Sequence, residues 1–183
     1  MIPENIKNNI RQDNMQDRLL YVMAQLDKET CEKIRGIDRL LYNLGIEVKK
    51  PPKVPYHITL GAFELHQEQE IQKRVEYVCR IHPRIPLTYN HIGLFHLNVL
   101  FFGPDVNAEL LALQQPFEKD RIRVHEWTAH TTLMMDEPDI ILKALPIVAE
   151  QFTGFHATVE SISLYEFWPS RFICQCPLQS PQT

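Results

Sequence analysis

The sequence has no excess of basic residues and no long apolar run. Its 183 residues include 19 Lys and Arg against 23 Asp and Glu, which gives a formal net charge of -4. A protein that coats nucleic acid by neutralising its phosphates needs the opposite sign, although this balance still allows a local basic cleft. No stretch reaches the roughly 18 apolar residues of a membrane span, and residues 1–17 lack the apolar core of a signal peptide. We therefore expect neither membrane insertion nor secretion.

Cysteine is scarce and lacks the spacing of a metal site. The four cysteines are Cys31, Cys79, Cys174 and Cys176. The last two are separated by one residue, whereas zinc-binding pairs usually have two or more residues between the thiols. Free cysteines are the norm in a reducing cytosol, so we expect a cytoplasmic protein.

A histidine metal site is equally disfavoured. No histidine pair has the i, i+4 spacing of a helical metal motif, and the nearest carboxylates are scattered. We therefore predict no metal and no other cofactor. The histidines considered as ligands are His66, His91, His96 and His125.

The remaining composition is that of one ordinary globular unit. The apolar share is 44% and the charged share is 23%, and no low-complexity linker divides the chain. We predict a single domain over residues 1–183, in which residues 1–17 form an N-terminal extension. A monomer is expected.

Hydrophobic periodicity predicts alternating strands and helices. The expected strands cover residues 19–26, 54–63, 85–95, 98–104, 126–135, 156–167 and 171–178, and helical spacing of apolar residues fills the intervals between most of them. The first six strands fall into two halves that each read β-α-β-α-β. We predict an α+β fold with two similar lobes, at about residues 18–95 and 96–178, whose sheets face a central cleft.

The tetrapeptide His-x-Thr-Leu occurs once in each half, beginning at His57 and at His130. Both copies fall on the predicted middle strand of their half. Side chains alternate along a strand, so each histidine shares a face with its threonine, Thr59 or Thr132, at a distance of roughly 6.5 Å. This spacing fits a phosphate held between an imidazole and a hydroxyl.

Two such segments suit metal-free phosphodiester chemistry. In-line displacement at phosphorus needs a base for the incoming hydroxyl and an acid for the departing oxygen. An imidazole pKa near 6.5 allows one histidine to be neutral while the other is charged at about neutral pH. Thr59 and Thr132 can donate hydrogen bonds to the non-bridging oxygens. A single His-x-Thr segment usually means only a hydrogen-bonded structural histidine, but the matched pair favours His57 and His130 as catalytic residues.

The motifs and their surroundings resemble a known family. The chain is similar to the 2H phosphoesterase superfamily, and within it to bacterial 2′,5′ RNA ligase-like proteins, over about residues 19–178. The matching segments are residues 55–61, 92–95, 98–104, 127–133 and 159–167. The resemblance implies a bilobal fold with pseudo-twofold symmetry, both histidines facing one cleft, and activity on 2′,3′-cyclic phosphates, 2′,5′-linked oligonucleotides or related cyclic nucleotides.

The second motif departs from the family pattern. Ala129 stands where many relatives have proline, and Met134 and Met135 stand in place of a small residue and an arginine. The phosphate-facing charge of that arginine is therefore absent from the motif.

Four other residues are weaker candidates for the cleft. Tyr56, Phe102 and Trp127 lie beside the motif strands and are candidates for base stacking or cleft lining, although aromatic residues near strands more often belong to the core. Arg171 follows a turn at residues 168–170 and is a candidate phosphate ligand, although an arginine at a turn is more often simply solvated.

Two classes of function remain open from the sequence. The first is an enzyme acting on RNA ends or small nucleotides, by hydrolysis or by ligation, in which His57 and His130 exchange the acid and base roles when the direction of the reaction changes. The second is a non-catalytic protein that binds nucleotides or RNA ends. Retention of both histidines and both threonines favours the enzyme, because binding alone does not require two titrating groups.

Overall fold

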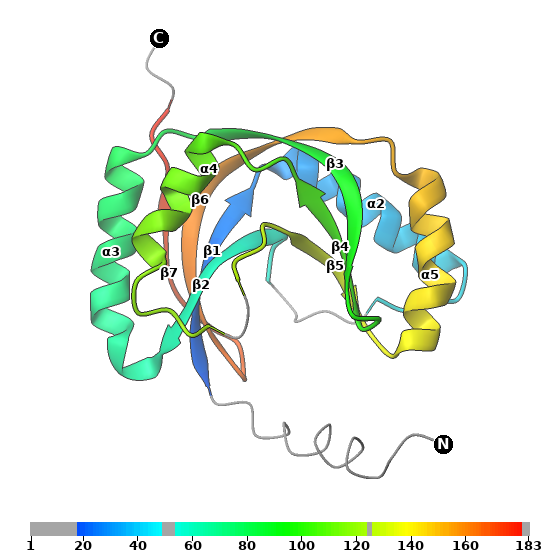
Figure 1. The fold of residues 1–183 in the computed structure, drawn as a ribbon, viewed down its shortest axis with the longest axis horizontal. Coiled ribbons are helices and arrows are strands. Elements are labelled where there is room, and N and C mark those ends of the chain that lie inside the picture. Colours follow the sequence, from blue (N-terminus) through cyan, green and yellow to red (C-terminus); the bar gives the residue numbers. More distant parts are fainter. Residues whose placement is uncertain (1–17, 49–53, 124–125, 181–183) are drawn as a thin grey trace.

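The computed structural model describes residues 18–48, 54–123 and 126–180, and these form a curved antiparallel sheet with helices packed on it (Figure 1). The strands are β1 (Leu19–Leu26), β2 (His57–Glu64), β3 (Ile85–Phe95), β4 (Val99–Pro104), β5 (Thr131–Met135), β6 (Phe155–Phe167) and β7 (Arg171–Pro177). The helices are α2 (Lys28–Asn43), α3 (Glu68–Ile81), α4 (Ala108–Gln114) and α5 (Pro138–Gln151), with 3-10 turns at Leu65–Gln67 and Gln115–Phe117. The α+β class predicted from the periodicity is confirmed. The predicted N-terminal extension lies outside the described residues.

The strand order shows that the two halves of the sequence share one sheet. The order is β2-β1-β6-β3-β4-β5, and β7 pairs with β6. β3 therefore lies between β6 and β4, while β6 lies between β1 and β3, so each half places its third strand beside the other half. The central pairing runs from Ile85 opposite Val159 to Tyr89 opposite Phe155. The prediction of two separate sheets is wrong, because the third strands pair with each other and join the halves.

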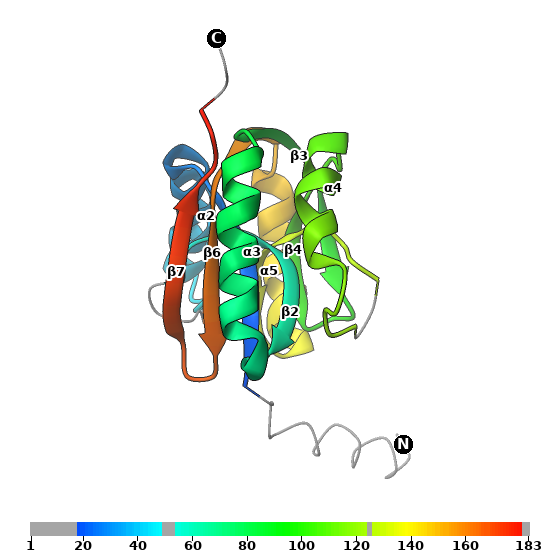
Figure 2. The ribbon, with the colours of Figure 1, turned by 90° about the vertical axis from the view of Figure 1, so that its left-hand side faces the viewer.

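The sheet bends until β2 and β5, the two ends of its six-strand order, contact each other (Figure 1). The helices pack on the outer face of this bend. In Figure 2, α3 crosses in front of β6 and β2, and α2 and α5 lie on the far side of the molecule. The inner face between β2 and β5 is thus left to the two His-x-Thr segments.

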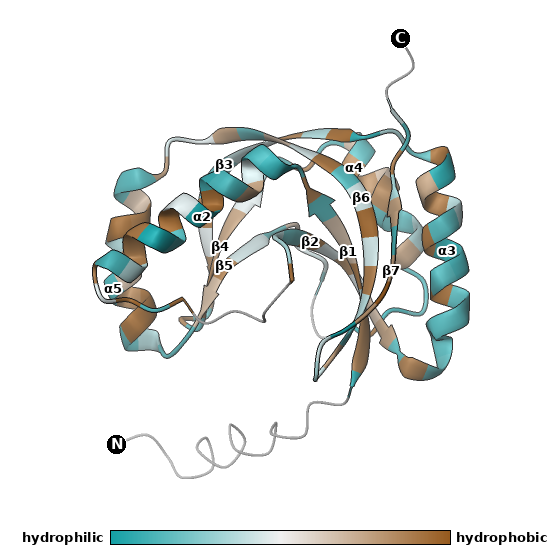
Figure 3. Cartoon of the chain, turned by 180° about the vertical axis from the view of Figure 1, so that it is seen from behind, coloured by the Kyte–Doolittle hydropathy of each residue, from teal (hydrophilic) through white to brown (hydrophobic). Residues whose placement is uncertain are grey.

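The core lies between the helices and the outer face of the sheet. Figure 3 shows apolar residues along the strands and polar residues on the outward faces of the helices. Each helix contributes one apolar stripe, as its periodicity predicts, and the stripe residues of α3 are Ile71, Val75 and Val78, all fully buried. Burial of side chains of this size stabilises the fold by roughly 1.5–3 kcal/mol each.

From the sequence we expect no membrane insertion, and the helices of the structure can be compared with that expectation. Among the described residues, no helix combines the length and the apolar character that crossing a bilayer requires.

Candidate active site

His57 is the first residue of β2, and its ring is held by the backbone that precedes it. The Nδ1 atom of His57 lies 2.8 Å from the carbonyl oxygen of Pro55. The residue between them, Tyr56, is buried against α2 and donates a hydrogen bond from its hydroxyl to Asp38. Burial, and then this bond to a carboxylate, raise the pKa of Tyr56. Tyr56 therefore anchors the start of β2 to α2 and sets the position from which His57 projects.

His130 is held in the same way, although it does not lie on a strand. Its Nδ1 atom is 2.7 Å from the carbonyl oxygen of Thr128. The ring packs against Phe95, with 4.7 Å between the ring centroids and an interplanar angle of 88°, and against Phe101 at 5.3 Å. The strand predicted over residues 126–135 begins only at Thr131, so this part of the prediction is wrong.

The two imidazoles thus share one local geometry. A carbonyl oxygen can only accept a hydrogen bond, so the Nδ1 atom of each ring carries the proton that it donates. In the neutral ring, Nε2 is then the unprotonated nitrogen that can take up a proton. Each histidine is therefore fixed in the tautomer that a general base or acid acting through Nε2 requires.

The residues of the two motifs line adjoining cavities on the inner face. His57, Thr59 and Thr132 line a cavity of about 300 Å³. His130 lines a cavity of about 190 Å³, which also has Thr59 in its wall. Thr59 therefore belongs to both, so the fold brings His57, His130, Thr59 and Thr132 into one continuous region.

Burial lowers the pKa of His57 from its usual value. The bond to Pro55 opposes this effect, and the positive charge that His130 can carry lowers the pKa further. This direction agrees with the position of the two rings along adjoining cavities. The lowered pKa favours the neutral form of His57, which is the form that a general base requires.

Trp127 joins the two motifs. Its indole Nε1 donates a hydrogen bond of 2.8 Å to the carbonyl oxygen of Thr59, and its ring lines the same cavity as His130. The structure thus places Trp127 at the cleft, as predicted. Its role in holding the segment before β5 against β2 could not be foreseen from the sequence.

Phe102 does not lie in the cleft, so this prediction is wrong. Its side chain is fully buried on the helix side of β4, where its ring stacks on Phe152 at 5.3 Å and 13° and meets the edge of Phe155 at 5.9 Å. The neighbouring Phe101 faces the cleft instead and contacts His130. Alternation along β4 places only one of these two phenylalanines on the inner face.

Arg171 does not line either motif cavity, because two carboxylates hold its guanidinium elsewhere. Its Nε donates to Glu166 at 2.6 Å, and its terminal nitrogens donate to both carboxylate oxygens of Glu68 on α3. The bonds to Glu68 and then to Glu166 raise the pKa of Arg171. The arginine that does reach the motif region is Arg121, which lines the cavity of His130 and pairs with Glu118 at 2.7 Å. No motif in the sequence singles out Arg121.

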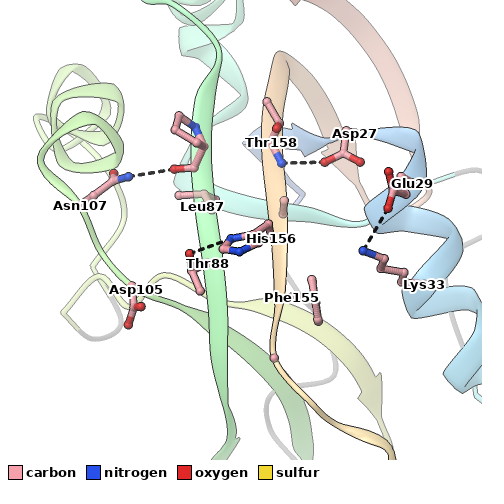
Figure 4. A pocket seen from close by; sticks show the side chains of 13 residues that line it. Asp27, Glu29, Lys33, Leu87, Thr88, Asp105, Asn107, Phe155, His156 and Thr158 are labelled. Atoms are coloured by element: carbon pink, nitrogen blue, oxygen red, sulfur yellow. Dashed lines mark hydrogen bonds and ion pairs between the residues drawn. The ribbon is translucent and has the colours of Figure 1, made fainter.

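A third cavity, of about 920 Å³, has a different chemistry (Figure 4). It shares no lining residue with the two motif cavities. A third His-x-Thr segment, His156-Ala157-Thr158, lies in its wall, where the Nδ1 of His156 is 3.2 Å from the hydroxyl of Thr88. The carboxylate of Asp27 accepts a hydrogen bond of 2.6 Å from the backbone of Thr158. This cavity contains a single imidazole, so it lacks the pair of histidines that the two motif cavities provide.

Metal ligands do not gather in the part of the chain that the structure describes. These residues contain no group of three or more histidine, cysteine or carboxylate side chains that could hold a metal ion. His125 lies outside the described residues.

Comparisons with known proteins identify the fold. No family model and no curated protein matches the chain. E. coli LigT complexed with phosphate matches with a TM-score of 0.59 at 17% identity, covering 89% of this chain and 98% of LigT. The chain has the fold of the LigT-like 2H phosphoesterases.

Further LigT-like structures agree over the same length. TT0787 of Thermus thermophilus matches with a TM-score of 0.63 at 13% identity, covering 90% of this chain and 100% of TT0787. E. coli LigT complexed with 3′-AMP matches with a TM-score of 0.58 at 16% identity, covering 89% of this chain and 98% of LigT. The LigT fold therefore extends over most of the chain, as the sequence resemblance predicts.

Proposed function

We propose that this protein is a metal-independent 2H-type phosphoesterase acting on 2′,3′-cyclic phosphate or 2′,5′-linked RNA ends, or on small nucleotides with the same linkages. The main support is the matched anchoring of two imidazoles. His57 and His130 each donate Nδ1–H to the carbonyl two residues earlier, at 2.8 and 2.7 Å. A protein that only binds nucleotides has no need of two titrating rings held by the same local bond.

The proposed reaction assigns one role to each histidine. In hydrolysis of a 2′,3′-cyclic phosphate, neutral His57 takes a proton from water, whose oxygen forms the new bond to phosphorus. The bond from phosphorus to one ribose oxygen breaks, and protonated His130 gives that oxygen its proton. Thr59 and Thr132 donate hydrogen bonds to the non-bridging oxygens, where negative charge increases in the transition state. In ligation a 5′-hydroxyl takes the place of water and the two histidines keep these roles, and in the reverse reaction, cleavage of the 2′,5′ linkage to a 2′,3′-cyclic phosphate, they exchange roles.

The comparisons are consistent with a nucleotide substrate. Besides the phosphate complex, E. coli LigT has been crystallised with 3′-AMP and with ATP. We extend this ligand class to the present chain because its motif cavities combine imidazole, hydroxyl and aromatic side chains. These groups can bind a phosphate and a base together.

We also propose that the two halves are pseudo-symmetric lobes about the cleft. The strand order β2-β1-β6-β3-β4-β5 is unchanged, apart from its direction, when β1, β2 and β3 are exchanged for β4, β5 and β6. Each half then supplies one His-x-Thr segment from an edge of the sheet.

The test of the proposed function is product analysis with EDTA present. The protein is incubated with a panel of 2′,3′-cyclic nucleotides and 2′,5′-linked dinucleotides, and the products are separated by chromatography. We expect turnover to persist in chelator, because the base, acid and oxyanion donors are all side chains. Activity lost in EDTA and restored by zinc or magnesium would instead indicate metal-assisted hydrolysis.

The lowered pKa of His57 predicts the acidic limb of the pH profile. A general base must be neutral. As the pH rises, His57 loses its proton at a pH lower than the usual imidazole pKa of about 6.5. The kcat/KM should therefore remain high at pH 6.5 and fall only at lower pH, as His57 becomes protonated. NMR titration of the imidazole signals checks the assignment. In His130→Gln the opposing positive charge is gone, so the pKa of His57 should rise, and an unchanged or lower value contradicts the proposed proximity.

A further inference from the structure

A continuous aromatic surface leads from the His57 cavity to the outer strand β7. Its central ring, Phe167, lies 5.5 Å from Tyr21, 6.1 Å from Tyr165 and 5.3 Å from Trp168 between ring centroids. Tyr165 in turn lies 5.4 Å from Phe172. We call these residues the aromatic track. Its members are Tyr21, Tyr165, Phe167, Trp168 and Phe172.

The strand register explains why the track runs across the sheet. Tyr21 of β1 is opposite Tyr165 of β6, and Tyr165 is in register with Phe172 of β7. Neighbouring strands lie about 4.8 Å apart, so this row extends roughly 10 Å from β1 to β7. Three track residues, Tyr21, Phe167 and Trp168, also line the cavity that contains His57. The track is therefore continuous with the candidate active site.

The outer end of the track is open to solvent. Trp168 is 48% exposed and Phe172 is 54% exposed, although both are large apolar rings. Exposed apolar side chains that adjoin one another and a cavity are typical of a binding surface. Among the described residues lining the His57 cavity, none is Lys, Arg, Asp or Glu. The described wall beside His57 therefore offers a ligand stacking and apolar contact.

We propose that the aromatic track binds the nucleotides of an RNA strand that precede its reactive terminal phosphate. The inference rests on the proposed function and narrows its substrate class to oligonucleotides. A cavity of about 300 Å³ is at the small end of ligand sites, so nucleotides beyond the terminal one must lie outside it. The exposed rings of Trp168 and Phe172 continue the track beyond this cavity. Unpaired RNA bases stack on such rings with little dependence on sequence.

The kinetic test compares chain lengths. The kcat/KM is measured for a 2′,3′-cyclic mononucleotide and for RNAs of two, four and six nucleotides ending in a 2′,3′-cyclic phosphate. We expect the longest RNA to be preferred over the mononucleotide by about tenfold or more, which is the value of one stacked base. Trp168→Ala and Phe172→Ala should each reduce that preference by about tenfold, mainly through KM. Trp168→Phe and Phe172→Tyr should retain most of it, because a ring remains.

The matched control removes an exposed aromatic ring elsewhere. Tyr77 on α3 is 54% exposed, as Phe172 is, but does not belong to the track. Tyr77→Ala should leave the length preference unchanged. Equal kcat/KM for all lengths in the wild type, or an equal loss of preference in Tyr77→Ala, would overturn the proposal.

A binding measurement separates the track from the proposed catalysis. Fluorescence anisotropy is used with a labelled six-nucleotide RNA ending in a 3′-phosphate, which requires no turnover. Affinity about tenfold weaker in Phe172→Ala supports the track even if the wild type hydrolyses no cyclic phosphate, in which case only the proposed function fails. Normal turnover with RNA affinity unchanged in both alanine variants refutes the track alone. A self-associating wild type that Trp168→Ala converts to a monomer, with RNA affinity unchanged, would identify the track as a subunit interface and overturn the proposal.

Discussion

Replacing either motif histidine with alanine should lower kcat by at least about a hundredfold, because each ring transfers one proton in the transition state. The imidazoles of His57 and His130 each donate to a backbone carbonyl two residues away, which tethers the ring locally, so we expect their removal to leave the fold intact. Initial rates on a 2′,3′-cyclic nucleotide and thermal melting by circular dichroism measure the two effects. We expect a large loss of rate with a nearly unchanged melting temperature.

His156 provides a matched control for these variants. It begins a third His-x-Thr segment and lines the separate cavity of Figure 4, where its ring contacts Thr88. His156→Ala should keep wild-type kcat. If the wild type binds a cyclic nucleotide but forms no product at any pH, and His57→Ala and His130→Ala bind equally well, the protein is a binding module and not an enzyme.

Phe102→Ala should lower the free energy of unfolding by about 3–5 kcal/mol, the usual cost of removing a fully buried aromatic ring. Phe102 has no exposed surface and packs between Phe152 and Phe155, so its loss leaves a cavity. Urea denaturation gives the value. The control is Phe172→Ala, which removes a ring that is 54% exposed and should cost less than about 1 kcal/mol. Similar costs for the two variants would contradict the burial of Phe102.

The local elements of the fold could be predicted from the sequence because their causes are local. The strands β1 and β3 begin and end at the predicted residues, and the buried stripe of α3 matches its apolar spacing. The short turn between β3 and β4 lies at the predicted position. Periodicity and turn residues are properties of neighbouring positions, so they can be interpreted without knowledge of the tertiary structure.

The sheet order could not be predicted, because it depends on contacts between distant segments. Nothing near Ile85 or Val159 indicates that their strands pair with each other. The segment before β5 shows the same limit. Its alternating residues predict a strand. In the structure, the indole of Trp127 donates a hydrogen bond to the carbonyl of Thr59, and the carbonyl of Thr128 accepts one from His130. These side-chain hydrogen bonds hold the segment in place without strand pairing.

In the site, residue type and spacing predict where the motif residues lie, while their catalytic role stays a prediction and their surroundings could not be foreseen. His57, Thr59 and Thr132 line one cavity, which the repeated tetrapeptide suggests. The sequence misplaces Phe102 because the choice between it and Phe101 depends on the register of β4, which shifts between Leu100 and Phe101. Arg171 cannot be interpreted from its neighbours, because one of its partners, Glu68, is 103 residues away in the sequence.

Because β3 and β6, the third strands of the two halves, pair with each other, they also determine which fragments of this chain can fold independently. A break in the turn between β3 and β4 would leave one fragment holding β1, β2 and β3 and another holding β4, β5, β6 and β7. In the first fragment β3 would lose both of its neighbours, β6 and β4. In the second, β6 would lose its long pairing with β1, which runs from Leu19 opposite Phe167 to Leu26 opposite Val159. Neither fragment can complete its own sheet, so the two must associate to fold.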